Sequence, residues 1–278
     1  MKIHGESITS RQNRTVIEVG KLTDRKAREA AKRFRFDGIK LLVEAVKNDV
    51  IPEMILLRES DADAVAERIF EGCGRSDFLS QARVLILADS VFEKISEEKS
   101  PEGVISVAKY IDKLQKIVTI YSSENFLPAT DERIVLLESV RDPINVGAII
   151  RSAAALGVDR LILSGDCADV YHPRAVRASM GALFNQRIDR VESLPDVIEL
   201  FQKQGRRVYA AALDPKACRL GDFEIAKTDC VVIGNEGHGL SKEVLDACER
   251  RVFIPMSERA ESFNAAVAAS ILMWEFTR

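Results

Sequence analysis

Residues 231–241 read VVIGNEGHGLS, an apolar run followed by a loop that holds three glycines. Glycine permits positive φ angles and lets a ligand approach the backbone closely. The order Gly234-x-x-Gly237-x-Gly239 reverses the dinucleotide fingerprint and lacks the Lys-Ser/Thr pair of a P-loop. Because the carboxylate of Glu236 would repel phosphate, the loop favours a cationic or hydroxyl-bearing ligand. A plain tight turn is the alternative.

A second stretch of chemical interest is 138–163, which reads ESVRDPINVGAIIRSAAALGVDRLIL. We expect Asn145 to cap a helix that begins at Val146, and Gly157 to end it. Arg151 lies off the apolar stripe of this helix and has small neighbours, which would let a ligand or a second subunit come close. Its planar guanidinium could bind a phosphate or a carboxylate. A solvent-facing arginine is the alternative.

A third stretch, residues 253–276, reads FIPMSERAESFNAAVAASILMWEF. Glu261, Ser262 and Asn264 gather where a helix over 263–277 is expected to begin, and Ser262 could cap it. The free N–H groups of a helix N-terminus bind anions, although ordinary capping is the simpler explanation in isolation. We expect four apolar side chains of this segment to point inward: Phe263, Val267, Ile271 and Trp274.

Strands and helices must alternate to position these stretches. The first part of the chain predicts a compact α/β unit. It has a helix that Thr23 can cap and that runs to about Phe34, an amphipathic helix in FDGIKLLVEAVKN and strands in IPEMILLRE, RVLILADS and GVISVAKY. The second part predicts strands over 134–138, 160–164, 186–191, 206–213, 229–234 and 250–255, and helices over 146–156, 174–182, 195–204, 241–248 and 263–277. This alternation is typical of a mostly parallel sheet covered on both faces.

Composition excludes several classes of protein. The chain has 278 residues, of which 46% are hydrophobic and 30% charged, as in a well-cored globular protein. No apolar run is long enough to span a membrane and no signal core is present, so we expect a cytoplasmic protein. Five scattered cysteines without a CxxC pair support neither a metal site nor a disulfide framework. Residues 1–48 hold 12 Lys/Arg against 6 Asp/Glu, which suggests a polyanionic partner or a solvated helix face.

Together and in this order, the three stretches resemble the three motifs of the SpoU (TrmH-type) family of RNA 2′-O-ribose methyltransferases, within the SPOUT superfamily. The matching runs are Asn145-Val-Gly-x-Ile-x-Arg151, Ile233-Gly-Asn-Glu-Gly-x-Gly-Leu, and Ile254-Pro-Met followed by Glu261-Ser-x-Asn. The intervening RASMGALFNQRI resembles the family's middle segment. More loosely, ITSRQN, FDGIKLLVEA and SPEGVISVAK resemble the family's substrate-binding domain, which has the fold of a kink-turn-binding ribosomal protein.

The resemblance implies an α/β fold in two domains. A smaller N-terminal α/β domain over 1–110 would bind RNA substrate, and a linker over 111–130 would lead to the catalytic SPOUT domain over 131–278. That domain would have a parallel sheet and a deep trefoil knot, and family members form homodimers through it. General folding rules do not predict a knot, because knots are nearly absent among folds.

The resemblance also implies S-adenosylmethionine as cofactor and no metal. The expected walls of its pocket are Leu213, Gly234, Asn235, Gly237, Ile254, Met256 and Phe263. Arg151 would contact the ribose hydroxyl and the adjacent phosphate, which could share the proton, and Ser262 would bind that phosphate. Asn145, Glu236 and Asn264 would fix the ribose and Arg151. Whether Glu236 contacts the ribose, the donor or Arg151 stays open.

The implied reaction is methyl transfer to a ribose 2′-hydroxyl of RNA. A full N-terminal domain favours 23S ribosomal RNA, because family members that act on tRNA use short terminal extensions. A tRNA 2′-O-methyltransferase and a catalytically inactive RNA-binding adaptor are the alternatives. The reversed glycine order and the lack of a ribose-binding acidic residue argue against a nicotinamide-dependent dehydrogenase. The methylated nucleotide, and a housekeeping as against an antibiotic-resistance role, stay open.

Overall fold

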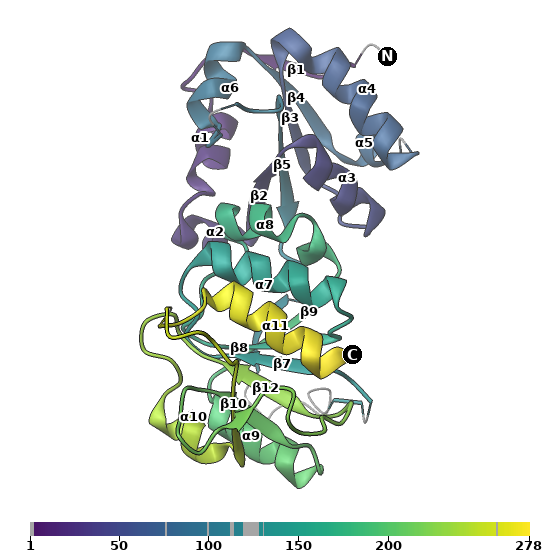
Figure 1. Cartoon of the computed structure of the whole chain (residues 1–278). Coiled ribbons are helices and arrows are strands. Elements are labelled where there is room, and N and C mark those ends of the chain that lie inside the picture. The colour runs from purple at the N-terminus through teal and green to yellow at the C-terminus, as the bar shows by residue number, and fades with distance from the viewer. Residues whose placement is uncertain are drawn as a thin grey trace. The chain divides into compact units, whose positions relative to one another are not determined.

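The computed structural model of the chain (Figure 1) describes residues 3–75, 77–98, 100–111, 128–129, 131–259 and 261–278, and the backbone alone of 114–118. The chain forms two compact units, one of Met1–Ile111 with Tyr171–Asn185, the other of Asp112–Val170 with Gln186–Arg278. The predicted domains over 1–110 and 131–278 did not anticipate that 171–185 belongs to the first unit. Most of the predicted linker over 111–130 lies outside the described residues.

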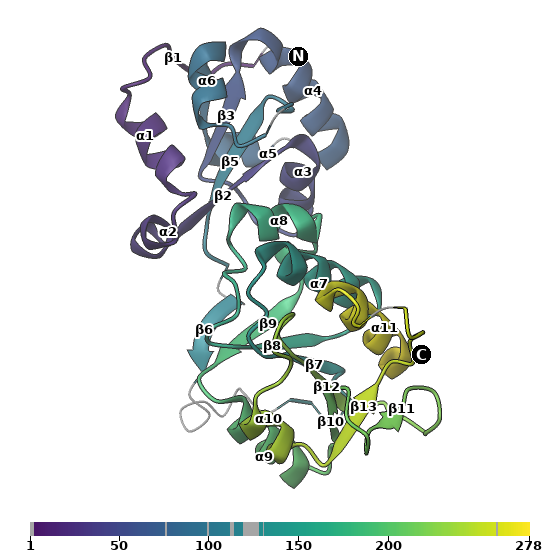
Figure 2. The same ribbon diagram turned by 60° about the vertical axis from the view of Figure 1, so that its left-hand side comes forward.

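The first unit is built on a mixed five-stranded sheet with the order β1-β4-β3-β5-β2, and all five strands are labelled in Figure 1. Figure 2 shows the same unit from another side. β4 pairs parallel with β1 and β3, whereas β5 pairs antiparallel with β3 and β2. The strands expected in IPEMILLRE, RVLILADS and GVISVAKY are confirmed as β3, β4 and β5. The bounds are Glu6–Ile8 (β1), Arg33–Asp37 (β2), Met54–Arg58 (β3), Arg83–Leu87 (β4) and Val104–Lys109 (β5).

Helices cover both faces of this sheet. α1 and α6 pack on one face, where Val16, Val19 and Phe92 join a core with the apolar side chains of the strands. α3 and α4 pack against each other on the opposite face (Figure 1). The bounds are Arg14–Lys21 (α1), Arg25–Ala31 (α2), Ile39–Lys47 (α3), Ala62–Cys73 (α4), Asp77–Gln81 (α5) and Asp89–Ile95 (α6), with a 3-10 turn at Glu59–Asp61 (η1).

The helix predicted from Thr23 to Phe34 is wrong at both ends. Asp24 is the N-cap of α2, where its carboxylate accepts a hydrogen bond from the N–H of Ala27 at 3.1 Å. The helix ends at Ala31, because Lys32 takes a left-handed conformation with φ 52°. The following RFRFD run then forms β2. Its alternating arginines and phenylalanines have the two-residue period of a strand.

The segment that joins the first unit from later in the chain is fixed by aromatic packing. It contains α8 (Pro173–Ser179) and a 3-10 turn at Ala182–Phe184 (η4). The ring of Tyr171 lies 4.6 Å from that of Phe34 and stacks on Tyr110 at 4.1 Å. The ring of Phe184 packs edge-on against Phe36 at 5.2 Å. Residues 171–185 are therefore part of the core around β2.

The second unit contains an eight-stranded sheet with the order β11-β13-β10-β12-β7-β8-β9-β6. Every pair of neighbouring strands is parallel, which confirms the predicted parallel sheet. β6 lies within the predicted linker over 111–130, and the two-residue β11 is not among the predicted strands. The bounds are Leu114–Val118 (β6), Ile134–Leu137 (β7), Arg160–Ser164 (β8), Arg187–Val191 (β9), Val208–Ala211 (β10), Cys218–Arg219 (β11), Cys230–Ile233 (β12) and Arg250–Phe253 (β13).

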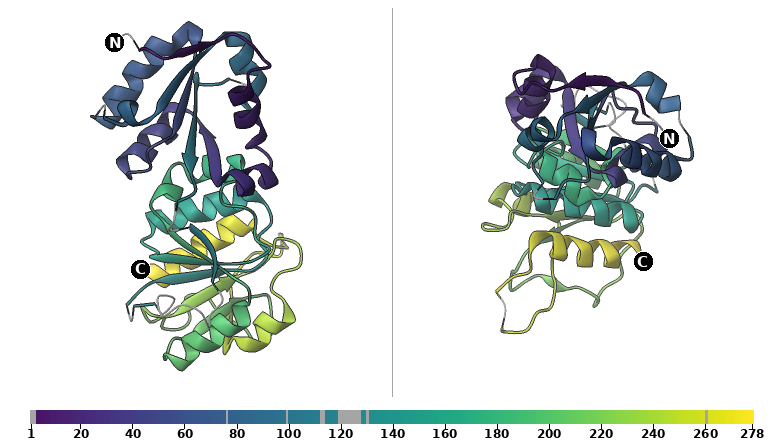
Figure 3. Two further views of the ribbon diagram at one scale, coloured as in Figure 1. Left: turned by 180° about the vertical axis from the view of Figure 1, so that it is seen from behind. Right: turned by 90° about the horizontal axis from the view of Figure 1, so that it is seen from above.

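Helices also cover both faces of the second sheet. α9 (Leu194–Lys203) and α10 (Lys242–Ala247) join the buried core on one face. α7 (Pro143–Ala155) and α11 (Ala265–Thr277) lie side by side on the other, as both views of Figure 3 show. The helices predicted over 146–156, 195–204, 241–248 and 263–277 are confirmed with shifts at their ends, whereas the one predicted over 174–182 is α8 of the first unit. The trefoil knot stays a prediction.

The cysteines differ in burial. Cys167, Cys230 and Cys248 are buried, whereas Cys73 and Cys218 are only partly buried. Burial raises the pKa of Cys230 and of Cys248 to about 12, so both thiols stay protonated. Among the described residues, the helices are all too short or too polar for a membrane crossing.

A buried ionic cluster stabilises the centre of the second sheet. The guanidinium of Arg160 on β8 donates to both carboxylate oxygens of Glu132, at 2.7 and 2.9 Å. It also donates to Asp189 on β9 at 3.2 Å. Burial raises the pKa of Asp189 despite the nearby Arg160 and Arg187. The side chain of Arg160 is only 1% exposed, so its charge depends on these carboxylates.

We predict that Glu132→Ala destabilises the protein by about 3 kcal/mol, because it leaves a buried guanidinium without its bidentate partner. Urea denaturation measures the loss. The matched control is Glu199→Ala, which removes a carboxylate whose ion pair with Lys203 is exposed on both sides. An exposed pair of this kind contributes at most about 1 kcal/mol. Equal losses in the two variants would contradict the argument.

Candidate active site

The carboxyl ends of four neighbouring strands meet at one edge of the second sheet. β7, β12, β10 and β13 run parallel, so the loops that follow them lie together. In open α/β sheets, ligands bind in the crevice beyond these ends. The loop after β12 is the glycine-rich run that ends at Ser241, and the loop after β13 leads into α11.

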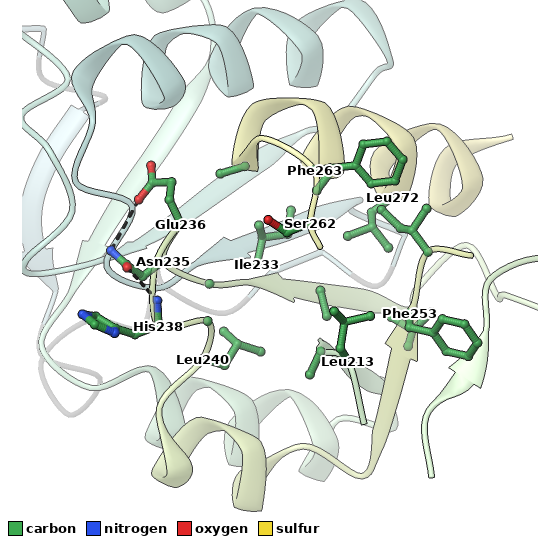
Figure 4. A pocket seen from close by; sticks show the side chains of 18 of the residues that line it. Leu213, Ile233, Asn235, Glu236, His238, Leu240, Phe253, Ser262, Phe263 and Leu272 are labelled. Carbon is green, nitrogen blue, oxygen red and sulfur yellow. Dashed lines mark hydrogen bonds between the residues drawn. The ribbon is translucent and has the colours of Figure 1, made fainter. Parts of the chain in front are cut away.

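These loops enclose a pocket of about 450 Å³ (Figure 4). Apolar side chains form one part of its wall, and the backbone of the glycine-rich loop forms another. Leu213, Phe263 and Leu272 lie across the pocket from Glu236 and Asn235 in the close view. The structure places every residue expected to form the cofactor site in this one pocket: Leu213, Gly234, Asn235, Gly237, Ile254, Met256 and Phe263.

The glycine-rich loop folds back on itself as a tight hairpin. Asn235 and Gly239 exchange backbone N–H···O hydrogen bonds of 2.9 and 3.0 Å. The side-chain oxygen of Asn235 accepts from the N–H groups of Gly237 at 2.8 Å and His238 at 3.1 Å. A Cβ at Gly234 would lie 2.6 Å from the carbonyl oxygen of Gly239, so only glycine fits there. A Cβ at Gly237 would meet nothing closer than 3.6 Å.

Two consecutive residues after β7 hold the two ends of this hairpin. The side-chain amide of Asn235 donates to the carbonyl of Ser139 at 2.7 Å. The carboxylate of Glu138 accepts from the N–H of Ser241 at 2.8 Å and from its hydroxyl at 2.6 Å. The hydroxyl of Ser241 also accepts from the N–H of Val244 at 3.2 Å, so Ser241 caps α10. The pocket wall is thereby fixed to the centre of the sheet.

Three of the predicted catalytic residues form one hydrogen-bonded chain. The side-chain amide of Asn145 donates to the carboxylate of Glu236 at 2.8 Å. The amide of Asn264 in turn donates to the side-chain oxygen of Asn145 at 3.0 Å. Asn145 is buried, with 7% of its surface exposed. These hydrogen bonds join α7, the glycine-rich loop and the start of α11, which are far apart in sequence.

The predicted caps of α7 and α11 are wrong. Asp142 caps α7 by accepting from the N–H of Ile144 at 2.9 Å, and Pro143 follows as the first helical residue, where a missing N–H costs nothing. Asn145 is thus free to face Glu236. Asn264, rather than Ser262, caps α11. Its side-chain oxygen accepts from the N–H groups of Ala266 at 2.9 Å and Val267 at 3.3 Å. Ser262 instead lines the pocket.

The predicted inward stripe of α11 is also largely wrong. Phe263, Val267 and Trp274 are exposed, and Ile271 is only partly buried. Phe263 precedes the helix and lines the pocket. The buried face of α11 consists instead of Ala265, Ala269, Leu272, Met273 and Phe276. This helix is apolar on most of its circumference, so its periodicity did not distinguish the buried face.

Arg151 is the one predicted catalytic residue that the structure does not bring to the others. It is exposed on α7 and is not part of the pocket wall. Within the described part of the chain it has neither a hydrogen bond nor an ion pair. Its neighbours on the exposed side of α7 are apolar or small, with Ile144 49% exposed and Ala155 also exposed. The guanidinium is therefore available to a ligand or to another molecule.

Sequence reasoning missed several residues of the site. His238 has no predicted role, but it is exposed and lines the pocket. Glu138 and Ser139 were not singled out, although both directly follow a strand at the edge where parallel strands end, which is a usable signal. Among the described residues there is no group of His, Cys, Asp and Glu side chains suited to hold a metal ion.

The family model described as SpoU rRNA Methylase family matches residues 132–274, and the MRM3-like substrate binding domain matches residues 13–106. The chain is 28% identical to the 23S rRNA (guanosine(2553)-2′-O)-methyltransferase RlmP of Bacillus subtilis (strain 168), over 97% of this chain and 98% of that protein. It is 34% identical to the 23S rRNA (uridine(2479)-2′-O)-methyltransferase of Streptomyces viridochromogenes, over 70% of this chain and 67% of that protein. The crystal structure of an AdoMet-bound rRNA methyltransferase from Sinorhizobium meliloti superposes with a TM-score of 0.78 at 27% identity, covering 98% and 97% of the two chains.

We predict that Gly234→Ala opens the hairpin of the glycine-rich loop, because the added methyl group would overlap the backbone of Gly239. Overpacking of this kind costs about 1–3 kcal/mol. Amide hydrogen exchange at Gly239, whose N–H bonds to Asn235, should therefore accelerate about tenfold or more. Gly237→Ala is the matched control and should leave this exchange unchanged. Similar acceleration in both variants would refute the steric explanation.

Proposed function

This chain belongs to the SpoU rRNA methylase family, and we propose that it transfers a methyl group from S-adenosylmethionine to a ribose 2′-hydroxyl of 23S ribosomal RNA. The observation that carries the proposal is the pocket at the carboxyl edge of the sheet, which is joined through Glu236 to Asn145 and Asn264. The names of two relatives and the AdoMet held by a solved structural neighbour support the same reaction.

The residues of the pocket fit the donor. Its volume of about 450 Å³ suits a ligand of this size. Leu213, Ile254, Met256 and Phe263 offer apolar surfaces for an adenine ring, and the loop backbone at Gly234 offers polar groups. When bound, S-adenosylmethionine supplies a methyl group on a positively charged sulfonium. The carboxylate of Glu236 suits such a cation better than it would suit a phosphate.

The hydrogen-bonded chain of Asn145, Glu236 and Asn264 orients the acceptor. The carboxylate of Glu236 accepts from Asn145 at one oxygen, and the amide of Asn235 approaches the other at 3.4 Å. Its direction is therefore fixed before substrate arrives, and it can accept a hydrogen bond from a ribose hydroxyl. Correct orientation of two reactants supplies about 7–11 kcal/mol of a barrier. Ser262, beside this cluster in the pocket wall, binds the adjacent phosphate.

Arg151 completes the site from a second copy of the chain. Apolar side chains are exposed on the face made by α7 and α11, with Ile144 at 49%, Val267 at 47% and Trp274 at 59%. Arg151 lies on the same helix as Ile144 and does not line the pocket of its own chain. Pairing of two such faces buries the apolar side chains and brings each Arg151 to the partner's ribose and phosphate. A guanidinium is a poor base, so the phosphate shares the proton.

Similarity along the whole chain supports ribosomal RNA as the substrate. The substrate-binding match covers residues 13–106, and RlmP aligns with the chain from end to end. The excess of Lys and Arg over residues 1–48 supplies charge for contacts with an RNA backbone. Phosphate contacts position an RNA without reading its sequence. Contacts to the bases must therefore select the target nucleotide.

We predict that the purified protein, given S-adenosylmethionine and 23S ribosomal RNA, creates one position that resists alkaline cleavage. A 2′-O-methyl group blocks the hydroxyl that would attack the neighbouring phosphate. Glu236→Ala should lower the rate of this modification about 100-fold or more, because it removes an oriented polar group from the site. Glu243→Ala, an exposed carboxylate on α10 outside the pocket, is the control and should keep the wild-type rate.

Other outcomes of that assay decide between functions. Protection of tRNA in place of ribosomal RNA would assign the chain to tRNA modification. Failure to bind S-adenosylmethionine in calorimetry, together with retained RNA binding, would identify an adaptor without catalytic activity.

We further predict that Arg151→Ala abolishes turnover but leaves donor binding intact, because Arg151 acts on the partner's pocket. Mixing Arg151→Ala chains with Asn264→Ala chains should then restore activity. Random pairing gives one complete site in half of the dimers, or about a quarter of wild-type activity. Light scattering should report a dimer for both variants.

Trp274→Glu provides the control for the mixing experiment. A charge on the apolar face should yield monomers and prevent recovery in the mixture. Wild-type-like activity of Arg151→Ala alone, or recovery that persists in monomers, would rule out the role of Arg151 across the dimer.

A further inference from the structure

Ser139 has a backbone conformation that residues other than glycine rarely adopt. Its φ is 54°, in the left-handed region. Three hydrogen bonds hold it there. Its N–H donates to the hydroxyl of Ser164 at 2.9 Å, its hydroxyl donates to Asp166 at 2.6 Å, and its carbonyl accepts from the amide of Asn235 at 2.7 Å. Strained positions of this kind persist only when their surroundings fix them, and they cluster at functional sites.

Asp166 is the common partner of the side chains around Ser139. One carboxylate oxygen accepts from the hydroxyl of Ser139 at 2.6 Å and from the guanidinium of Arg141 at 3.3 Å. The other accepts from the hydroxyl of Ser164 at 2.6 Å. Partial burial acts to raise the pKa of Asp166, but the hydrogen bonds from Ser139, Ser164 and Arg141 outweigh it and leave the pKa below its ordinary value. The group is therefore a carboxylate at neutral pH, with both oxygens engaged.

These bonds continue into the glycine-rich loop. The amide of Asn235 that bonds to Ser139 is on the same side chain as the oxygen that gathers the N–H groups of Gly237 and His238. If Ser139 leaves its left-handed conformation, its carbonyl turns away from Asn235. The side chain of Asn235 then loses the hydrogen bond that holds it in place. Asp166 does not line the pocket and is about half exposed, yet only Ser139 separates it from Asn235.

We propose that Asp166 is a positioning residue for the donor pocket, acting through Ser139 to hold Asn235 and the loop that Asn235 organises. The proposal rests on the proposed function, because it takes the ligand of this pocket to be S-adenosylmethionine. It assigns to the loop after β8 a part in donor affinity, although that loop contributes nothing to the pocket wall.

The central test is Asp166→Ala, with donor affinity measured by calorimetry in the absence of RNA. We expect the Kd for S-adenosylmethionine to rise about tenfold, the equivalent of losing roughly one hydrogen bond to a charged group. In steady-state assays, the KM for the donor should rise by a similar factor. The KM for RNA and the kcat at saturating donor should stay within about twofold of wild type. A fall in kcat with donor affinity unchanged would overturn the proposal.

Two variants separate positioning from general destabilisation. Arg141→Ala removes the exposed guanidinium that pairs with Asp166 but keeps the hydrogen bond from Ser139 to Asp166. Donor affinity should therefore change less than twofold. Glycine adopts a left-handed conformation without help, so Ser139→Gly introduced into Asp166→Ala should recover donor affinity to within about threefold of wild type. If the double variant binds the donor as weakly as Asp166→Ala, the path through Ser139 is excluded.

The wild-type titration keeps the two proposals apart. A wild-type protein that does not bind S-adenosylmethionine would contradict the proposed function itself. A wild-type protein that binds the donor, beside an Asp166→Ala variant that binds it equally well, would contradict only the role of Asp166. Should Asp166→Ala fail to fold, Ser139→Ala removes the same hydroxyl–carboxylate bond and carries the same expectations for donor affinity.

Discussion

The parallel pairing of β7 with β12 is the interaction on which the site depends. These strands lie side by side, with Val231 opposite Val135 and Ile233 opposite Leu137. The pairing brings the residues that follow β7 to the glycine-rich loop, across separations of 96 residues for Ser139 and Asn235 and 103 for Glu138 and Ser241. The hydrogen bonds that fix the two ends of the glycine-rich loop depend on this adjacency. Closing so long a loop is slow, because its entropy must be lost first.

Three polar side chains of the site, those of Asn145, Glu236 and Asn264, are hydrogen-bonded to one another before any ligand arrives. Asn145 uses its amide on Glu236 and its oxygen on Asn264, while Asn264 also caps α11. Buried amides and carboxylates are costly unless hydrogen-bonded, so this arrangement lets a polar cluster persist beside an apolar pocket. It also leaves little rearrangement to be made when substrate binds, which is what an enzyme gains from preorganisation.

Local pattern predicted the strands, the family resemblance predicted the pocket residues, and long-range packing decided the rest. The runs around β7, β8, β12 and β13 have clear apolar signals, and the expected cofactor residues lie in the loops after β10, β12 and β13. The predicted capping residues were wrong where two residues able to cap lie close together in sequence. For α7, the Asp142–Pro143 pair carried a usable signal. The exposed Trp274 and Val267 were missed because apolar residues were assumed to face the core of a single chain. The left-handed Ser139 has no sequence signature, since its three hydrogen-bond partners lie at the end of β8 and in the loops after β8 and β12, far away in sequence.

The path of the chain between its two units constrains how such proteins can be recombined. The chain passes from one unit to the other at 111–112, at 170–171 and at 185–186, because residues 171–185 pack with the first unit. Phe34 and Phe36 depend on Tyr171 and Phe184 for their packing. A gene fusion that exchanged only the first 110 residues would keep the core around Val16, Val19 and Phe92 but would remove the aromatic partners of Phe34 and Phe36. A chimera that preserves this packing must exchange residues 171–185 together with the N-terminal stretch.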